Sequence, residues 1–128
     1  MWNKDWVINV KTTQCDMTPE IRAYLDDKIN AISKLVVVSG EDAKVTCDVE
    51  LEKAQPQQTG PIWRAEMNLT FDGNMYRSEA TAESINAALD EVKDEMTKRL
   101  RRDKKKRFDR LRRGGAKMKD WMRFGRKK

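Results

Sequence analysis

Four stretches of the chain alternate apolar and polar residues with a period of two, which is typical of a strand with one buried face. In the clearest of them, every odd-numbered residue from Val45 to Leu51 is apolar, whereas the residues between them are polar or acidic. The pair Asp72-Gly73 separates the last two stretches and predicts a tight hairpin, because both residues tolerate a positive φ. The four predicted strands cover residues 6–12, 44–53, about 63–71 and about 74–81.

Two further stretches place apolar residues at helical spacing. The first covers about 18–36, and Thr18 with Pro19 supplies a capping oxygen and a favourable first helical residue. The second covers 85–112, since no helix breaker occurs before Gly114-Gly115. A helix of that length is about 42 Å long, whereas a strand of about eight residues spans about 27 Å. The end of the second helix should therefore project beyond the sheet.

The predicted order of elements is β-α-β-β-β-α. Because every strand has one apolar face and both helices have one apolar stripe, the economical arrangement is an α+β fold with two helices packed on one face of a four-stranded mixed sheet. A crossover through the first helix makes the first strand parallel to a neighbour. We expect one domain over 1–113, which ends in the long basic helix, and a basic, aromatic tail over 114–128 hinged at the glycines.

The residue inventory argues against catalysis and against a bound metal. Histidine is absent, so a Ser-His-Asp triad, a Cys-His pair and histidine ligands are excluded. The two cysteines are far apart in sequence, and there is no phosphate-binding loop or nucleophile-elbow motif. The longest aliphatic run, 35–38, is too short to span a membrane. We therefore expect a protein that is not an enzyme, has no cofactor and does not span a membrane.

The net charge of +6 conceals a strong asymmetry along the chain. Residues 1–92 contain 9 cationic and 16 acidic residues, a net charge of −7, whereas residues 93–128 contain 18 and 5, a net charge of +13. A basic third on an acidic body indicates a polyanionic partner. Nucleic acid is the commonest such partner, and an anionic membrane surface is the second.

The stretch 98–107 concentrates this charge, since eight of its ten residues are cationic and Asp103 alone is acidic. Like charges three or four residues apart on a helix repel one another, and a bound anion would relieve that repulsion. A merely solvated helix face is the alternative. The free face of the sheet carries acidic residues that repel phosphate, so the helices are the better binding surface. The candidate RNA-binding residues are Arg22, Lys28, Lys34, Lys98, Arg101, Arg102, Lys104, Lys105, Lys106 and Arg107.

The tail mixes cations with Trp121 and Phe124. Its aromatic rings could stack on unpaired bases while the cations track phosphates. Alternatively, Trp121 joins Met118 and Met122 in a short apolar patch suited to a protein groove or a membrane surface. A tail without ordered structure in the free protein is the third interpretation.

Several segments, taken together in their order and spacing, resemble the ribosome hibernation-promoting factor / ribosome-associated inhibitor family. These segments are Val7-Ile8-Asn9-Val10, Thr18 to Leu25 with Lys28, Ala80-Thr81-Ala82-Glu83 and Ala87-Ala88-Leu89-Asp90. The resemblance covers about residues 6–106. Four cations match basic positions of the family, namely Lys28, Lys98, Arg102 and Lys104. Departures occur where the family often has an aromatic or basic residue, at Ala31, Leu35-Val36, Asn86 and Glu95.

The resemblance implies a cytoplasmic protein that binds the small ribosomal subunit in the channel used by mRNA and tRNA and silences idle ribosomes. We therefore expect binding to rRNA, inhibition of translation by occupancy, competition with mRNA and tRNA, and a monomer in the free state. The separate dimerisation domain of the long family form is not expected, because the last 36 residues are largely used by the second helix. A double-stranded RNA- or DNA-binding protein unrelated to ribosomes is the alternative, and a protein adaptor that uses the tail is a third.

Overall fold

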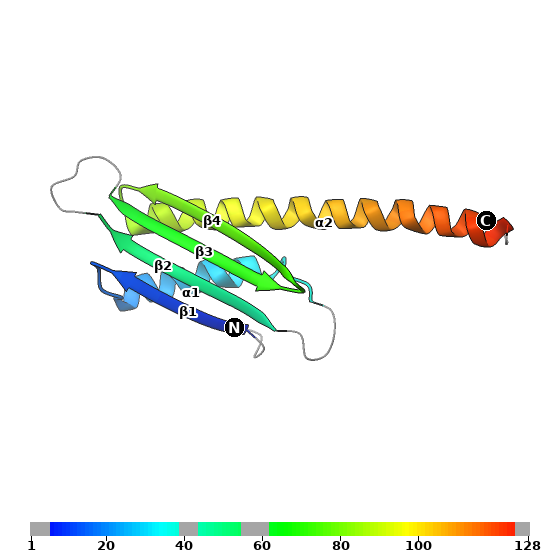
Figure 1. Cartoon of the computed structure of the whole chain (residues 1–128). Helices are drawn as coiled ribbons and strands as arrows, with labels where there is room; N and C mark the ends of the chain where they lie inside the picture. Colours follow the sequence, from blue (N-terminus) through cyan, green and yellow to red (C-terminus); the bar gives the residue numbers. More distant parts are fainter. Residues whose placement is uncertain (1–5, 39–43, 55–61, 125–128) are drawn as a thin grey trace.

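The computed structural model describes residues 6–38, 44–54 and 62–124, with the backbone alone for Arg107 and 111–124. The order of elements is β-α-β-β-β-α, as the sequence predicts (Figure 1). These elements are β1 (Trp6–Thr13), α1 (Pro19–Ser33), β2 (Val45–Lys53), β3 (Trp63–Phe71), β4 (Asn74–Ala82) and α2 (Ile85–Phe124).

The four strands form one mixed sheet in the order β1-β2-β3-β4. β1 runs parallel to β2, and the other two pairs are antiparallel. The hairpin between β3 and β4 turns at Asp72 and Gly73, whose φ angles are 50° and 75°. Positive φ at both positions is what a tight two-residue hairpin requires. The predicted mixed sheet, with its first strand parallel to a neighbour, is confirmed.

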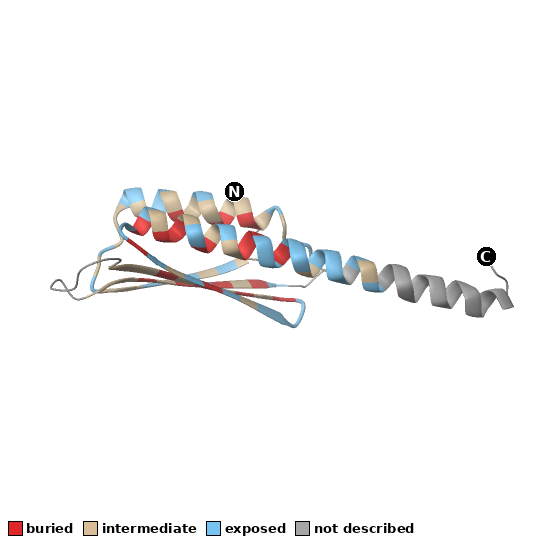
Figure 2. Ribbon diagram, turned by 90° about the horizontal axis from the view of Figure 1, so that it is seen from above, coloured by how far each residue is buried: buried red, intermediate tan, exposed pale blue. Residues whose placement is uncertain are grey.

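Both helices lie on one face of the sheet, and the core lies between the two layers (Figure 2). The predicted inward residues of β2 are buried, and so are those of β3 except Trp63, which is partly buried. The apolar stripes of α1 and α2 are buried from Leu25 to Ile32 and from Ile85 to Leu100. On β4 the small buried Ser78 lets α2 approach closely, and its Oγ lies 3.0 Å from the carbonyl oxygen of Val92. The predicted α+β fold is therefore confirmed.

Helix α1 begins where the sequence predicts and ends three residues earlier. The Oγ of Thr18 accepts a hydrogen bond of 3.1 Å from the backbone N–H of Ile21, and Pro19 is the first helical residue. At the other end, Leu35 N–H donates to the carbonyl of Ile32 at 2.9 Å, a three-residue step that tightens and closes the last turn. The β-branched residues that follow favour an extended backbone over a helix.

Helix α2 continues to Phe124, so the predicted end at residue 112 is wrong. Its 40 residues give a length of about 60 Å at 1.5 Å per residue, and the second half projects far beyond the sheet (Figure 1). The backbone is helical at Gly114 and Gly115, and the division into a domain over 1–113 and a hinged tail stays a prediction. A glycine costs a helix about 1 kcal/mol without forbidding it, and the surrounding Arg, Lys, Ala and Met residues are strong helix formers. A separate function for 114–128 stays a prediction.

Candidate nucleic-acid interface

The charge of α2 changes sign along its length. Residues 85–97 contain four acidic residues and one lysine, whereas 98–110 contain nine cationic and two acidic residues. The change falls at the end of the described hydrophobic core, because Leu100 is the last buried residue among the side chains of the helix that the structure describes. The acidic half of α2 therefore covers the sheet, and the stretch 98–110, hereafter the basic segment, begins where the helix leaves it.

The basic segment presents most of its charges to solvent. It extends over about 18 Å of helix at 1.5 Å per residue. Within it, Lys98, Arg101, Arg102 and Lys105 are separated by three or four residues, so they share the side of the helix opposite the buried Leu100. The exposed cations of the basic segment include Lys98, Arg101, Arg102, Lys104, Lys105, Lys106 and Arg110.

Asp103 interrupts the run of cations for a structural reason. The hydroxyl of Tyr76 on β4 donates a hydrogen bond to the Asp103 carboxylate, so this acidic side chain connects α2 to the sheet. A second connection lies two turns earlier, where Oγ of the buried Ser78 is 3.0 Å from a carboxylate oxygen of Glu95. The carboxylates that face the body thus fix the direction in which the basic segment projects.

The three candidate residues of α1 and its C-terminal end differ in their surroundings. Arg22 is exposed and forms an ion pair of 3.3 Å with Asp26, one turn along the helix. Lys34 is exposed at the C-cap of α1. Lys28 is only 19% exposed, and its Nζ lies 3.0 Å from the carboxylate of Asp90 on α2.

The Lys28–Asp90 pair forms a small polar connection between the two helices with Tyr24. The Tyr24 hydroxyl donates a 2.6 Å hydrogen bond to the same carboxylate, and the Lys28 ammonium lies 4.6 Å from the centre of the Tyr24 ring. The bond from Tyr24 holds the pKa of Asp90 below its ordinary value, and the bond to Asp90 raises the pKa of Lys28. The charge of Lys28 is thus offset within the protein.

Three predicted site residues lie partly outside what the structure describes. The structure places the backbone of Arg107, Trp121 and Phe124 in helix α2, but it does not describe their side chains. Phosphate contact by Arg107 and base stacking by Trp121 and Phe124 stay predictions.

The outer face of the sheet is acidic, as predicted, but its carboxylates are organised around one arginine. The Nη1 atom of Arg64 lies 3.1 Å from Glu52 and 3.6 Å from Glu50, and the guanidinium also contacts Glu66 and Glu79. The hydrogen bond between Arg64 and Glu79 lowers the pKa of the Glu79 carboxyl and raises the pKa of the Arg64 guanidinium. Sequence periodicity could not predict this cluster, because it depends on the pairing register of three strands.

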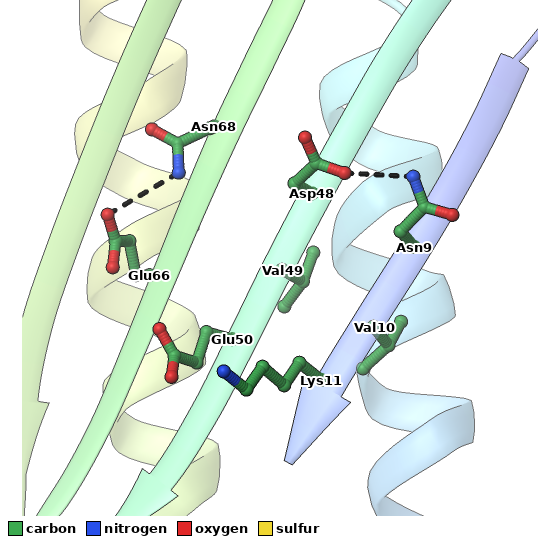
Figure 3. A pocket seen from close by; sticks show the side chains of 8 residues that line it. All are labelled: Asn9, Val10, Lys11, Asp48, Val49, Glu50, Glu66 and Asn68. Carbon is green, nitrogen blue, oxygen red and sulfur yellow. Dashed lines mark hydrogen bonds between the residues drawn. The ribbon is translucent and has the colours of Figure 1, made fainter. Parts of the chain in front are cut away.

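The same face contains a shallow pocket of about 250 Å³ that is unsuited to phosphate (Figure 3). Asp48, Glu50 and Glu66 line it beside the single cation Lys11, and Asn9 donates a 2.9 Å hydrogen bond to Asp48. Within the described part of the chain, no group of three or more His, Cys, Asp or Glu side chains could hold a metal ion. The geometry thus favours the helical side for a polyanion.

The fold and the exposed basic helix define a small α+β protein suited to binding a polyanion. Residues 8–107 match the family model described as "Sigma 54 modulation protein / S30EA ribosomal protein", and the chain belongs to this family. The resemblance identified from the sequence is therefore confirmed. A search of curated proteins found no match.

Two solved structures share the fold. The N-terminal domain of Protein Y from Thermus thermophilus matches with a TM-score of 0.59 and 22% identity, over 75% of this chain and 97% of that one. A ribosomal subunit interface protein from Coxiella burnetii matches with a TM-score of 0.58 and 11% identity, over 76% and 96%. Among the described helices, α2 included, none combines the length and apolar character needed to cross a membrane.

Proposed function

We propose that the protein binds the small ribosomal subunit by contacting rRNA with the basic segment of α2. The observation that supports this most directly is the row of exposed cations that begins where the hydrophobic core ends. Membership of a family whose description names a ribosomal protein, and the fold shared with a ribosomal subunit interface protein, point to the ribosome as the source of the polyanion.

The shape and charge of the protein fit RNA backbone recognition. Lysine and arginine side chains neutralise phosphates and release condensed counterions, which makes binding favourable and dependent on salt. Because α2 is one continuous helix, its cations have fixed relative positions and lose little backbone entropy on binding. Lys28 enters the proposal as a residue that positions α1 against α2, since Asp90 already neutralises it. Arg22 and Lys34 provide outlying contacts.

Bound in this way, the protein acts in the cytoplasm as a ribosome hibernation factor that inhibits translation by occupancy. It fills the channel used by mRNA and tRNA, competes with both, and performs no catalysis. The acidic outer face of the sheet points away from the nearest phosphates, because Asp48, Glu50 and Glu66 would repel them. The basic segment points toward them.

Co-sedimentation with purified small subunits tests this proposal through two variants matched in charge. Arg101→Glu with Lys105→Glu reverses two exposed cations of the basic segment, and we expect the affinity to fall by about tenfold or more. Lys11→Glu with Lys44→Glu reverses two exposed cations elsewhere and should leave the affinity within about twofold of the wild type. Circular dichroism verifies that both variants are folded.

The same assay at increasing salt provides a second criterion. About six phosphate contacts predict a steep linear fall of log affinity with log salt, and the reversed basic segment should reduce that slope. Equal binding by the two charge-reversed variants, or an affinity independent of salt, would contradict the proposal. Equally tight binding to duplex RNA or DNA of unrelated sequence would instead favour a nucleic-acid-binding protein without a ribosomal role.

A further inference from the structure

A small apolar groove lies where α2 leaves the sheet. It encloses about 60 Å³ between α2, the segment that follows α1, and the end of the β3–β4 hairpin. One charged and five apolar or aromatic side chains line most of it, namely Leu35, Val37, Phe71, Tyr76, Leu100 and Lys104. These residues come from parts of the chain that are far apart in sequence.

The walls of the groove suit a flat, apolar ring. Phe71 and Tyr76 stack with ring centroids 5.4 Å apart and an interplanar angle of 22°. Phe71 is buried in the core, so Tyr76 supplies the accessible part of this aromatic wall. Val37 also lines the groove and is 66% exposed, although the residues on either side of it pack partly against the core. It therefore adds an accessible aliphatic side chain to the lining of the groove.

The groove is lined by one lysine and one carboxylate, and a second lysine is adjacent in sequence to a lining residue. Lys104 lines it directly and is exposed, and Lys34 precedes Leu35 at the end of α1. The one acidic side chain at the groove, Asp103, accepts the hydrogen bond from Tyr76 and is thus held against the sheet. An apolar wall beside lysines complements a molecule with a flat apolar part and an attached negative charge.

Size and charge together select the class of ligand. A volume of about 60 Å³ is far below the roughly 300 Å³ at which pockets begin to enclose a drug-sized molecule. It accepts one face or edge of a ring from a longer chain. Proteins recognise unpaired RNA by stacking a base on aromatic or apolar side chains while cations hold the neighbouring phosphate.

We propose that this groove binds one unpaired nucleotide of RNA, with the base against Val37 and the Phe71–Tyr76 wall and a phosphate at Lys104. The proposal rests on the proposed function and adds to it a preference for single-stranded RNA beside the sequence-independent contacts of the basic segment. Lys34 and Lys104, predicted separately from the sequence, then serve the same bound nucleotide.

The substitution Val37→Asp tests the groove without disturbing the core, because the side chain is mostly exposed. It places a negative charge where the base would lie. We expect its affinity for a short unstructured RNA to fall about tenfold, as for the loss of one stacked base. Its affinity for an RNA duplex of equal length should stay within about twofold of the wild type. Val7→Asp, at an exposed valine of β1, is the matched control and should bind both RNAs as the wild type does.

Methyl NMR locates the contact directly. Addition of the unstructured RNA should shift the methyl signals of Leu35 and Val37, whereas the duplex should leave both unshifted and affect only Leu100, which belongs to the basic segment. Equal affinity of Val37→Asp and Val7→Asp for the unstructured RNA would overturn the proposal. Methyl shifts produced by extracted ribosomal proteins and not by RNA would overturn it in favour of a protein partner.

The two proposals fail in different ways. If Arg101→Glu with Lys105→Glu binds small subunits as tightly as the wild type, the proposed function is wrong. If that variant loses binding while Val37→Asp binds the unstructured RNA normally, the basic segment keeps its role and the groove alone is excluded.

Discussion

At the scale of single residues, Lys28 shows how a predicted binding charge can have an internal role. In sequence it is a cation on an amphipathic helix, and the resemblance to the family predicts a binding role for it. In the structure its Nζ is 3.0 Å from the carboxylate of Asp90, a residue 62 positions later in the chain. Such a pair cannot be derived from local spacing, because it depends on how α1 and α2 pack.

Asp90, the acidic partner in this pair, makes the stability of the folded protein depend on pH. The hydrogen bond from Tyr24 and the charge of Lys28 hold the pKa of Asp90 below its ordinary value. A carboxyl with a lowered folded-state pKa stabilises the folded protein above its unfolded-state pKa, and this stabilisation is lost as the pH falls through the folded-state value. We expect the free energy of unfolding, measured in urea, to fall as the pH is lowered from about 6 to about 3. The fall should be smaller in Asp90→Asn.

A neighbouring acid on the same helix supplies the control. Asp94→Asn removes one exposed negative charge from α2 and should follow the pH dependence of the wild type. Glu79 also has a lowered pKa, because of Arg64, and contributes equally to all three proteins. If Asp90→Asn loses as much stability in acid as the wild type does, the pairing across the two helices is not stabilising.

At the scale of elements, the strands and helix stripes could be predicted because each has one buried face. Alternation in 44–53 and the helical spacing from Ile85 to Leu100 both identify the buried side correctly. The pairing around Arg64 could not be predicted, since it depends on strand order and register. The groove beside Val37 was missed for the same reason, because its walls come from three separate elements.

The end of α2 was predicted wrongly for a different reason. A glycine pair often ends a helix, but in the helix interior each glycine costs only about 1 kcal/mol. The residues on both sides of Gly114 and Gly115 favour helix strongly enough to continue it to Phe124. The helix propensity of the whole stretch thus outweighs the local helix-ending signal of the glycine pair.

Proline at one of these glycines tests the continuity of α2. We expect Gly115→Pro to interrupt the helix, because proline removes a backbone donor and clashes with the preceding turn. The backbone chemical shifts of residues 116–124 should then lose their helical values. Gly115→Ala should keep or strengthen them, since alanine favours helix by about 1 kcal/mol over glycine.

Unfolding of the body should be unchanged in both glycine variants. Among the described side chains of α2, Leu100 is the last that is buried, so we expect the end of the helix to add little to the stability of the body. A wild-type protein without helical chemical shifts in 116–124 would contradict the continuous helix. A large loss of stability in Gly115→Pro would show that the end of α2 packs on the body.

At the scale of the whole molecule, the acidic body and the basic projecting helix give the protein a strong charge asymmetry. Near a large polyanion, such a molecule is oriented before contact, because attraction of the basic end and repulsion of the acidic end act together. Screening limits this effect to about 8–10 Å at physiological salt. The proposed orientation of the basic segment toward phosphate is therefore consistent with the charge distribution.

The size of the body makes occupancy a physically sufficient means of inhibition. A compact unit of about 100 residues has a radius of gyration near 13 Å, and α2 adds a rod about 60 Å long in total. Under the proposed function, a body of these dimensions held by phosphate contacts in a channel that admits nucleic acid would exclude mRNA and tRNA by volume. Inhibition then requires no chemical step, and it must be reversible by the molecules that the protein displaces.

Order of addition in a reconstituted translation assay tests this directly. When excess mRNA and initiator tRNA are bound before the protein, we expect inhibition to weaken strongly, and when the protein is added first, to be nearly complete. Raising the concentration of mRNA and tRNA should shift the inhibitory concentration upward in proportion, as simple competition requires. Arg101→Glu with Lys105→Glu should inhibit weakly in either order, whereas Lys11→Glu with Lys44→Glu should behave as the wild type. Inhibition that ignores both the order and the dose of the competitors would place the protein at a remote site, because occupancy of a shared channel cannot be independent of its other occupants.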